Sequence, residues 1–189
     1  MISYVKKCYS DYRIKDWPIL VTGQDYAGKT TAVHQMVRGE YVTVPSTRWL
    51  PNYEVKRSYA RKPFQVYEWD SCDKDKLQPL YNSYYNKFKA LVYVVDSTNI
   101  DIMAEDALYF QKLLRNDHLN DDIPILIMAN KQDLPTALSL KEISDKYGLE
   151  SLKRPWHIIA TCALRENGLE ESLEWLADQL DIWKNEQDV

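Results

Sequence analysis

Residues 23–31 read GQDYAGKTT and fit the spacing GxxxxGK[ST], between an apolar run and an amphipathic one. The glycines at both ends let the backbone curl so that its N–H groups can bind phosphate oxygens, and a following helix adds partial positive charge. Lys29 would bridge the terminal phosphates, and the Thr30 hydroxyl would ligate Mg²⁺. The predicted phosphate-binding residues in this stretch are Gly23, Asp25, Tyr26, Ala27, Gly28, Lys29, Thr30 and Thr31.

A second polar stretch, NKQD at residues 130–133, follows the apolar run IPILIMA. An Asp at the end of a parallel strand can accept two hydrogen bonds from guanine N1–H and the 2-amino group, and adenine offers neither. Such discrimination reaches roughly ten-thousand-fold or more. Asp133 therefore predicts GTP or GDP, whereas a P-loop kinase would not need NKQD. The predicted base-binding residues are Asn130 as a brace, Lys131 along the base plane, Asp133, and Cys162 and Ala163 in TCA, with the Ala163 backbone at guanine O6.

The elements that must position these loops are short apolar runs that alternate with amphipathic ones, as in ALVYVVD followed by IMAEDALYFQKLLRN. This alternation predicts an α/β fold with a parallel sheet covered by helices on both faces. In the last amphipathic run, leucines at 169, 173, 176 and 180 predict one apolar helix face. Residues 53–70 contain two extended runs around a Lys-Pro break, which predicts a hairpin and one antiparallel edge strand.

The composition of the chain excludes several classes of protein. The chain has 189 residues, a net charge of -4 and a pI near 5.4, which argue for one domain and against nucleic-acid binding. Its cysteines, Cys8, Cys72 and Cys162, are far apart and odd in number, so neither a disulfide framework nor a CxxC metal site is predicted. No run is long enough to span a bilayer, and the N-terminus lacks the apolar region of a signal peptide. We expect a cytoplasmic protein.

Together these stretches resemble the Arf and Arf-like branch of the Ras superfamily of small GTPases. The resemblance rests on GQDYAGKTT, VRGEYVTVPST, WD followed by KLQPLY, VYVVDST, MANKQDLPTAL, TCA and GLEESLEWLADQL. It implies a P-loop NTPase small G-domain over residues 18–185, with a mostly parallel six-stranded sheet and one antiparallel edge strand. It also implies a monomeric GTP/GDP switch that binds Mg²⁺, an exchange factor and effectors, in membrane trafficking or transport related to organelles or cilia.

The resemblance also implies roles for the two switch regions. The second Mg²⁺ ligand is Ser46 if VPST is aligned on the family's Ile-Pro-Thr, and Thr47 if residues are counted without a gap from the phosphate loop, which we slightly favour. Asp70 would contact Mg²⁺ through water. The family shows three aromatic residues to effectors, and the matching positions are Trp49, Trp69 and Tyr84; core packing explains Trp69 equally well.

The family's Trp-Asp-Val-Gly-Gly-Gln stands here as residues 69–74, WDSCDK. The second glycine normally offers its N–H to the γ-phosphate, and Asp73 takes that place with an added carboxylate. The catalytic glutamine is replaced by Lys74, which only donates hydrogen bonds and cannot orient water in the same way. We predict very slow or absent GTP hydrolysis unless another residue substitutes for the glutamine. The alternative function is a non-catalytic pseudo-GTPase scaffold with a structural nucleotide.

Residues 1–17 form the predicted N-terminal segment, in which residues 2–12 place apolar side chains three and four apart, as an amphipathic helix does. Residue 2 is Ile, so the glycine needed for N-myristoylation is absent. Without a lipid so short a helix binds membrane weakly. Docking on the G-domain is one expectation, and weak peripheral membrane contact is the other.

Overall fold

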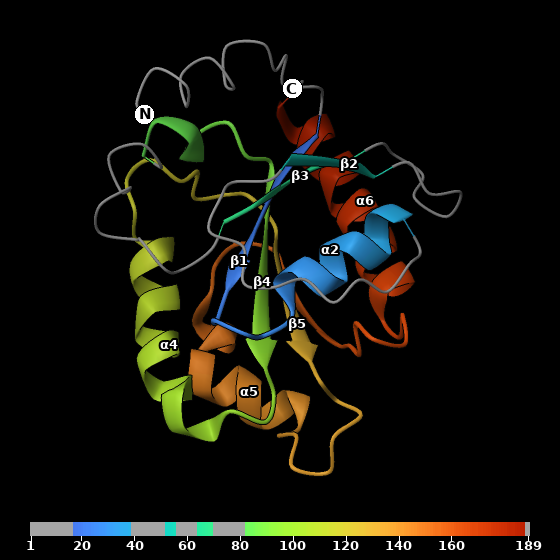
Figure 1. The fold of residues 1–189 in the computed structure, drawn as a ribbon. Helices are drawn as coiled ribbons and strands as arrows, with labels where there is room; N and C mark the ends of the chain where they lie inside the picture. The colour runs from blue at the N-terminus through green and yellow to red at the C-terminus, as the bar shows by residue number, and fades with distance from the viewer. Residues whose placement is uncertain (1–16, 39–51, 56–63, 70–81, 188–189) are drawn as a thin grey trace, which may run out of the picture.

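The computed structural model describes residues 17–38, 52–55, 64–69 and 82–187, which centre on one sheet of six strands (Figure 1). The strand order is β2-β3-β1-β4-β5-β6. Five strands run parallel, and β2 pairs antiparallel with β3 at one edge. The strands are β1 (Pro18–Gly23), β2 (Asn52–Val55), β3 (Phe64–Glu68), β4 (Ala90–Asp96), β5 (Ile125–Asn130) and β6 (Trp156–Ala160).

Helices cover both faces of the sheet, as the alternating pattern predicts (Figure 1). One apolar cluster packs α2 and α6 against the sheet, and a second packs α4 and α5 against the opposite face. The central strands β1, β4 and β5 are buried along their whole length, which explains their continuous apolar sequences. The helices are α2 (Lys29–Arg38), α4 (Ile100–Leu114), α5 (Leu140–Tyr147) and α6 (Leu169–Gln187), with a 3₁₀ turn η2 (Leu149–Ser151).

The apolar stripe predicted for the last helix is confirmed. Leu169, Leu173, Leu176 and Leu180 are each at most 1% exposed and belong to the cluster between α6 and the sheet. Helix α5 shows how local sequence sets an element's limits. Ser139 and Glu142 form a reciprocal capping box at its start, and Gly148 ends it in the left-handed conformation.

The carboxyl ends of four parallel strands meet at one edge of the sheet. Gly23 pairs with Val94, and Asp96 pairs with Asn130. Loops that follow β1, β4, β5 and β6 therefore leave the sheet side by side. This is the place where open α/β sheets bind ligands.

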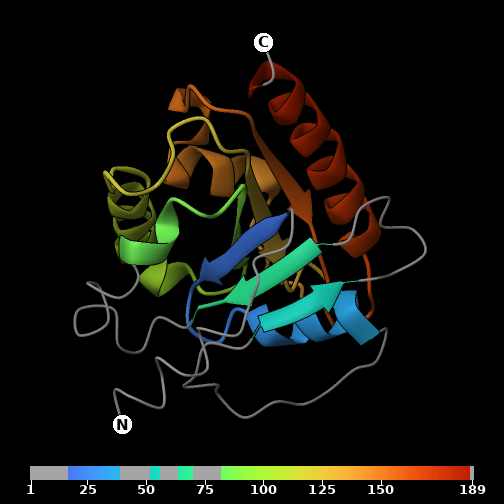
Figure 2. The ribbon, with the colours of Figure 1, turned by 90° about the horizontal axis from the view of Figure 1, so that it is seen from above.

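Strand β3 lies over α2, and its side chains alternate between the two faces of the sheet. Figure 2 shows α2 alongside β2 and β3. Val66 belongs to the cluster on the α2 face, whereas Tyr67 and Trp69 pack on the opposite side. This alternation turns Glu68 toward α2.

Within the described residues, no helix combines the length and apolar character that a membrane crossing requires. The predicted amphipathic residues 2–12 lie outside the described part of the chain.

Candidate nucleotide-binding site

The loop between β1 and α2 passes so close to neighbouring strands that it needs glycine at two positions. Gly23 has a φ of +137° and Gly28 a φ of +93°. A Cβ atom on Gly23 would lie 2.1 Å from the carbonyl oxygen of Val94. On Gly28 it would lie 2.5 Å from Nδ2 of Asn130. The curled loop is thus fitted against the ends of β4 and β5.

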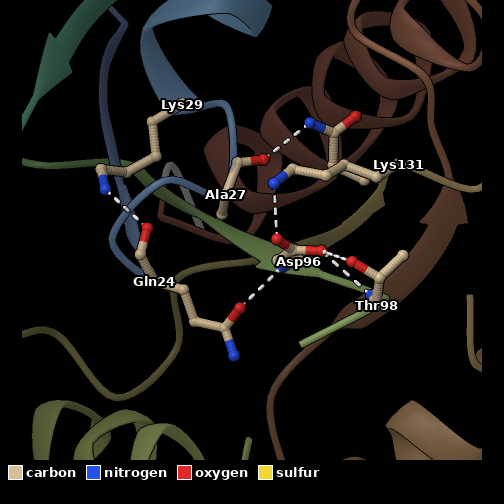
Figure 3. Close-up of polar contacts among 7 residues, drawn as sticks. Gln24, Ala27, Lys29, Asp96, Thr98 and Lys131 are labelled. Carbon is tan, nitrogen blue, oxygen red and sulfur yellow. Dashed lines mark hydrogen bonds and ion pairs between the residues drawn. The ribbon is translucent and has the colours of Figure 1, made fainter. Parts of the chain in front are cut away.

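The ammonium group of Lys29 folds into this loop. Lys29 is 6% exposed, and its Nζ donates to the carbonyl oxygen of Gln24 at 2.8 Å (Figure 3). The same Nζ lies 3.3 Å from the carbonyl oxygen of Gly23, to which it also donates. These acceptors are neutral. A phosphate oxygen in the loop would offer the same ammonium a stronger, charge-assisted hydrogen bond.

The other predicted phosphate-binding side chains surround the same turn. Asp25 is half-buried, and its Oδ1 atom finds no hydrogen-bond partner in the described part of the chain. Tyr26 is 81% exposed, while Ala27 is fully buried. Thr31 is half-buried in the first turn of α2.

Asn130 ties the loop after β1 to the loops after β5 and β6. Its Nδ2 atom donates to the carbonyl oxygen of Ala27 at 2.7 Å. Its Oδ1 atom accepts from the backbone N–H of Ala163 at 2.9 Å and from the hydroxyl of Thr161 at 3.3 Å. One buried side chain therefore joins three segments that are far apart in the sequence. The contact of the Ala163 N–H with guanine O6 stays a prediction; in this structure that N–H donates to Asn130 Oδ1.

Lys131 forms an ion pair that the sequence reasoning missed. Its Nζ lies 2.5 Å from Oδ2 of Asp96 (Figure 3), and Oδ1 of Asp96 accepts from the N–H and hydroxyl of Thr98 at 3.0 and 2.7 Å. Burial raises the pKa of Asp96, but the hydrogen bonds from Lys131 and Thr98 outweigh it and hold that pKa below its ordinary value. The position of Asp96 at the end of ALVYVVD was the available signal.

Asp133, the predicted base reader, is exposed beside Cys162. Burial raises the pKa of the Cys162 thiol, and the neighbouring Asp133 carboxylate raises it further, so the thiol stays protonated. Gln132 fixes the loop from within: its Nε2 donates to the Ser97 hydroxyl at 2.8 Å and to the Leu138 carbonyl at 2.9 Å. The carboxylate of Asp133 is thus presented to solvent from an anchored loop.

Three non-glycine residues in the described part of the chain adopt positive φ, and each lies in a different loop at this edge. Tyr26 has a φ of 61°, Lys131 of 66° and Glu166 of 61°. Left-handed backbone costs a side-chain-bearing residue of order 1–3 kcal/mol, and such strain gathers at functional sites. The strain supports the assignment of this edge as the ligand site.

The hydroxyl of Thr30 donates a hydrogen bond to Oε1 of Glu68 at the end of β3. Glu68 is 1% exposed. The sequence reasoning did not single out Glu68, because it matched Trp69 and Asp70 to the family's Trp-Asp. The signal was available in the period of two along β3, which places Glu68 on the face of Val66.

Of the two interpretations left open for Trp69, effector contact and core packing, the structure favours core packing. Trp69 is only 5% exposed and packs edge to face on Tyr85 and Phe88, with ring centroids 5.1 and 5.2 Å apart, so it belongs to the core and not to an effector surface. Tyr84 is half-buried and holds the ammonium of Lys87 4.5 Å from its ring centroid. The predicted residues outside the described ranges are Ser46, Thr47, Trp49, Asp70, Asp73 and Lys74.

A chain of hydrogen bonds runs from the phosphate loop into the core. Oε1 of Gln24 accepts from the N–H of Asp96 at 2.8 Å, and its Nε2 donates to the Tyr147 hydroxyl at 3.3 Å. The hydroxyls of Tyr147 and Tyr93 both donate to the Asp106 carboxylate, at 2.6 and 2.9 Å. Burial, followed by Asp106, raises the pKa of both tyrosines far above the ordinary value. The loop is thereby fastened to α4 and α5.

A comparison with protein families matches residues 2–180 to the ADP-ribosylation factor family. The match includes every loop described at this edge of the sheet.

Proposed function

The chain belongs to the ADP-ribosylation factor family of small GTPases, and from that premise we propose that it is a GTP/GDP-dependent regulator that recruits effector proteins. Membership implies guanine-nucleotide binding. The observation that best supports the proposal is a pair of hydrogen bonds at Asn130, which donates to the Ala27 carbonyl and accepts from the Ala163 N–H, because they join the phosphate loop to both base loops. A ligand that contacts all three loops would meet a preformed site.

Each loop has a role in this proposal. The N–H groups from Gly23 to Lys29 surround the phosphates, and the Lys29 ammonium moves from carbonyl oxygens to phosphate oxygens. Asp133 selects guanine through two hydrogen bonds. The Lys131 stem lies along the base, and its ammonium stays anchored on Asp96.

Members of the family bind the nucleotide together with Mg²⁺, and the residues present fit that ion. The Thr30 hydroxyl donates its proton to the buried carboxylate of Glu68, and a cation would bind the same hydroxyl through an oxygen lone pair. The described residues include no group of three or more His, Cys, Asp or Glu side chains that could hold a metal ion. Mg²⁺ at phosphates needs no such group, because phosphate and water supply most of its ligands.

Slow or absent hydrolysis remains part of the proposal. Its support is the sequence, which has Asp73 and Lys74 where the family has glycine and the catalytic glutamine. Lys74 lacks the acceptor that would orient an attacking water. The same residues support the alternative, a pseudo-GTPase scaffold whose nucleotide is structural.

The proposed partners are effectors on a surface that includes Trp49 and Tyr84, an exchange factor and, through residues 2–12, a weak membrane contact. A role in trafficking or in transport related to organelles or cilia rests on the family alone. So does the second Mg²⁺ ligand, Thr47 or Ser46.

Nucleotide content tests the function directly. The full chain would be purified, denatured and analysed by chromatography, and GDP or GTP is expected at close to one per chain. Lys29→Ala should lose the nucleotide, whereas Lys112→Ala, on the exposed face of α4, should keep it. A folded wild-type chain that binds neither GDP nor GTP, or prefers ATP, would refute the proposal.

Exchange separates the regulator from the scaffold. GDP and a non-hydrolysable GTP analogue would be loaded in turn, and tryptophan fluorescence recorded for each form. A regulator should give two distinct spectra. Equal affinities with unchanged fluorescence would favour the scaffold.

A further inference from the structure

The sequence motif and the structure point to different carboxylates for one role at the start of α2. The Trp-Asp motif points to Asp70, but the described carboxylate that contacts the phosphate-loop helix belongs to Glu68, whose Oε1 accepts the Thr30 hydroxyl proton. Glu68 ends β3 and is 1% exposed. Its position follows from the parallel register, in which Glu68 pairs with Val21 two residues before Gly23. That register brings the side chain level with the phosphate loop.

We propose that Glu68 is the carboxylate that positions Thr30 for Mg²⁺, in place of Asp70. This inference rests on the proposed function, since the ion arrives with the nucleotide. A hydroxyl has one proton and two lone pairs, so a hydroxyl whose proton is donated to Glu68 would bind a cation through its oxygen. The buried negative charge also favours a divalent ion nearby.

Glutamate is suited to this place by its length. It has one more methylene than aspartate, which extends its reach by about 1.5 Å, the length of a carbon–carbon bond. The pairing register of β3 against β1 therefore decides which carboxylate reaches Thr30, more than the match of residues 69 and 70 to the family's Trp-Asp motif does. A side chain from the strand itself therefore reaches Thr30.

The contact with Thr30 also offsets part of the free-energy cost of burying the Glu68 carboxylate. A buried carboxylate is costly unless it is paired or near a cation. The Thr30 hydroxyl meets part of that need, and Mg²⁺ would meet more of it. Bound ion and buried carboxylate should therefore stabilise each other.

The test compares Glu68→Gln with Asp70→Asn in the full chain. Both changes remove a charge and keep the shape, and the amide oxygen introduced by Glu68→Gln would still accept the Thr30 proton, so the fold should survive. The readout is the dissociation rate of a fluorescent GDP analogue at free Mg²⁺ concentrations set with EDTA. Loss of a residue that orients a metal ligand typically weakens metal affinity about 10- to 100-fold. We expect Glu68→Gln to raise the Mg²⁺ midpoint by that factor and Asp70→Asn to leave it at the wild-type value.

The metal-free arm separates metal positioning from a purely structural role. Without Mg²⁺, Glu68→Gln should release GDP no faster than wild type, because a negative charge near the phosphates has been removed. Faster release of GDP both with and without the ion would mean a structural role and overturn the inference, as would a shift for Asp70→Asn that equals or exceeds that of Glu68→Gln.

Two further results distinguish misfolding, and failure of the proposed function, from failure of the inference about Glu68. Should Glu68→Gln unfold, as judged by circular dichroism, Glu68→Asp keeps the charge but shortens the reach and should give a smaller midpoint shift in the same direction; an unshifted midpoint would overturn the inference. A wild-type chain that retains no GDP at any Mg²⁺ concentration refutes the proposed function itself. A wild-type chain that retains GDP and a Glu68→Gln chain with an unchanged midpoint refute only the role of Glu68.

Discussion

The side-chain carbonyl of Gln24 accepts a hydrogen bond from the backbone N–H of Asp96, 2.8 Å away, and so fastens the phosphate loop to the end of β4. Asp96 in turn holds Lys131, which lies in the loop that carries the base reader. The phosphate and base parts of the site are therefore connected twice, through Asn130 and through Gln24 with Asp96. A substitution that breaks either connection should therefore weaken nucleotide contacts in both the phosphate part and the base part of the site.

Gln24→Met should destabilise the protein and loosen the nucleotide. Methionine has a similar length but makes neither hydrogen bond, so the Asp96 N–H and the Tyr147 hydroxyl lose a partner. An unsatisfied buried group costs about 1–3 kcal/mol. Urea unfolding should show a loss of that size, and release of a fluorescent GDP should be faster.

Gln35→Met is the matched control on α2. Gln35 is 3% exposed, and its Oε1 finds no hydrogen-bond partner among the residues that the structure describes. Removal of a buried, unsatisfied amide should leave stability unchanged or raise it by about 1 kcal/mol. If the two methionine variants lose equal stability, the hydrogen bonds of Gln24 contribute little.

The Asp96–Lys131 pair should make stability depend on pH in the acid range. The pKa of Asp96 is lowered from its ordinary value of 3.8, so the folded state binds this proton less readily than the unfolded chain does. Its contribution is therefore present above pH 3.8 and is lost as the pH falls toward the lower folded pKa. Thermal unfolding from pH 7 to pH 3 should show a smaller acid-induced drop in Asp96→Asn than in wild type.

The control is wild type measured at the same ionic strength at each pH. An Asp96→Asn chain that destabilises in acid as steeply as wild type would contradict the assignment.

Trp69→Ala should damage the fold itself. Trp69 fills the core beside Tyr85 and Phe88, and truncation of a buried aromatic residue to alanine costs about 3–5 kcal/mol. Urea unfolding would measure the loss. Tyr26→Ala, at a side chain 81% exposed, should change stability far less. Near-wild-type stability of Trp69→Ala would restore its interpretation as a surface residue for effectors.

Sequence reasoning succeeded where chemistry depends on neighbouring residues. The alternation of apolar runs sufficed for the covered parallel sheet, and the leucines of α6 sufficed for its buried face. GQDYAGKTT and NKQD identified loops that the structure brings to one edge. In each case the signal lies within a single segment.

It failed where a residue's role depends on pairing with a distant segment. The contact of Glu68 with Thr30 depends on the register of β3 against β1, and a match of residues to a sequence motif carries no information about that register. Asp96 acquires its role only because β4 and β5 pair Asp96 with Asn130 and set Lys131 beside it. The sequence left two interpretations of Trp69 open, and core packing follows from the aromatic residues at 85 and 88 that cover it.

The two tyrosines on Asp106 give the folded protein a spectroscopic signature in alkali. The chain has 14 tyrosines, and two of them, Tyr93 and Tyr147, cannot ionise while they stay buried on a carboxylate. Their pKa values are raised above the ordinary 10.0, so their stabilising effect is complete below pH 10 and declines above it, where only the unfolded chain can release these protons. Tyrosinate absorbance should therefore rise gradually as surface phenols titrate, then jump when the core opens, which makes the ultraviolet spectrum a built-in gauge of whether the domain is intact.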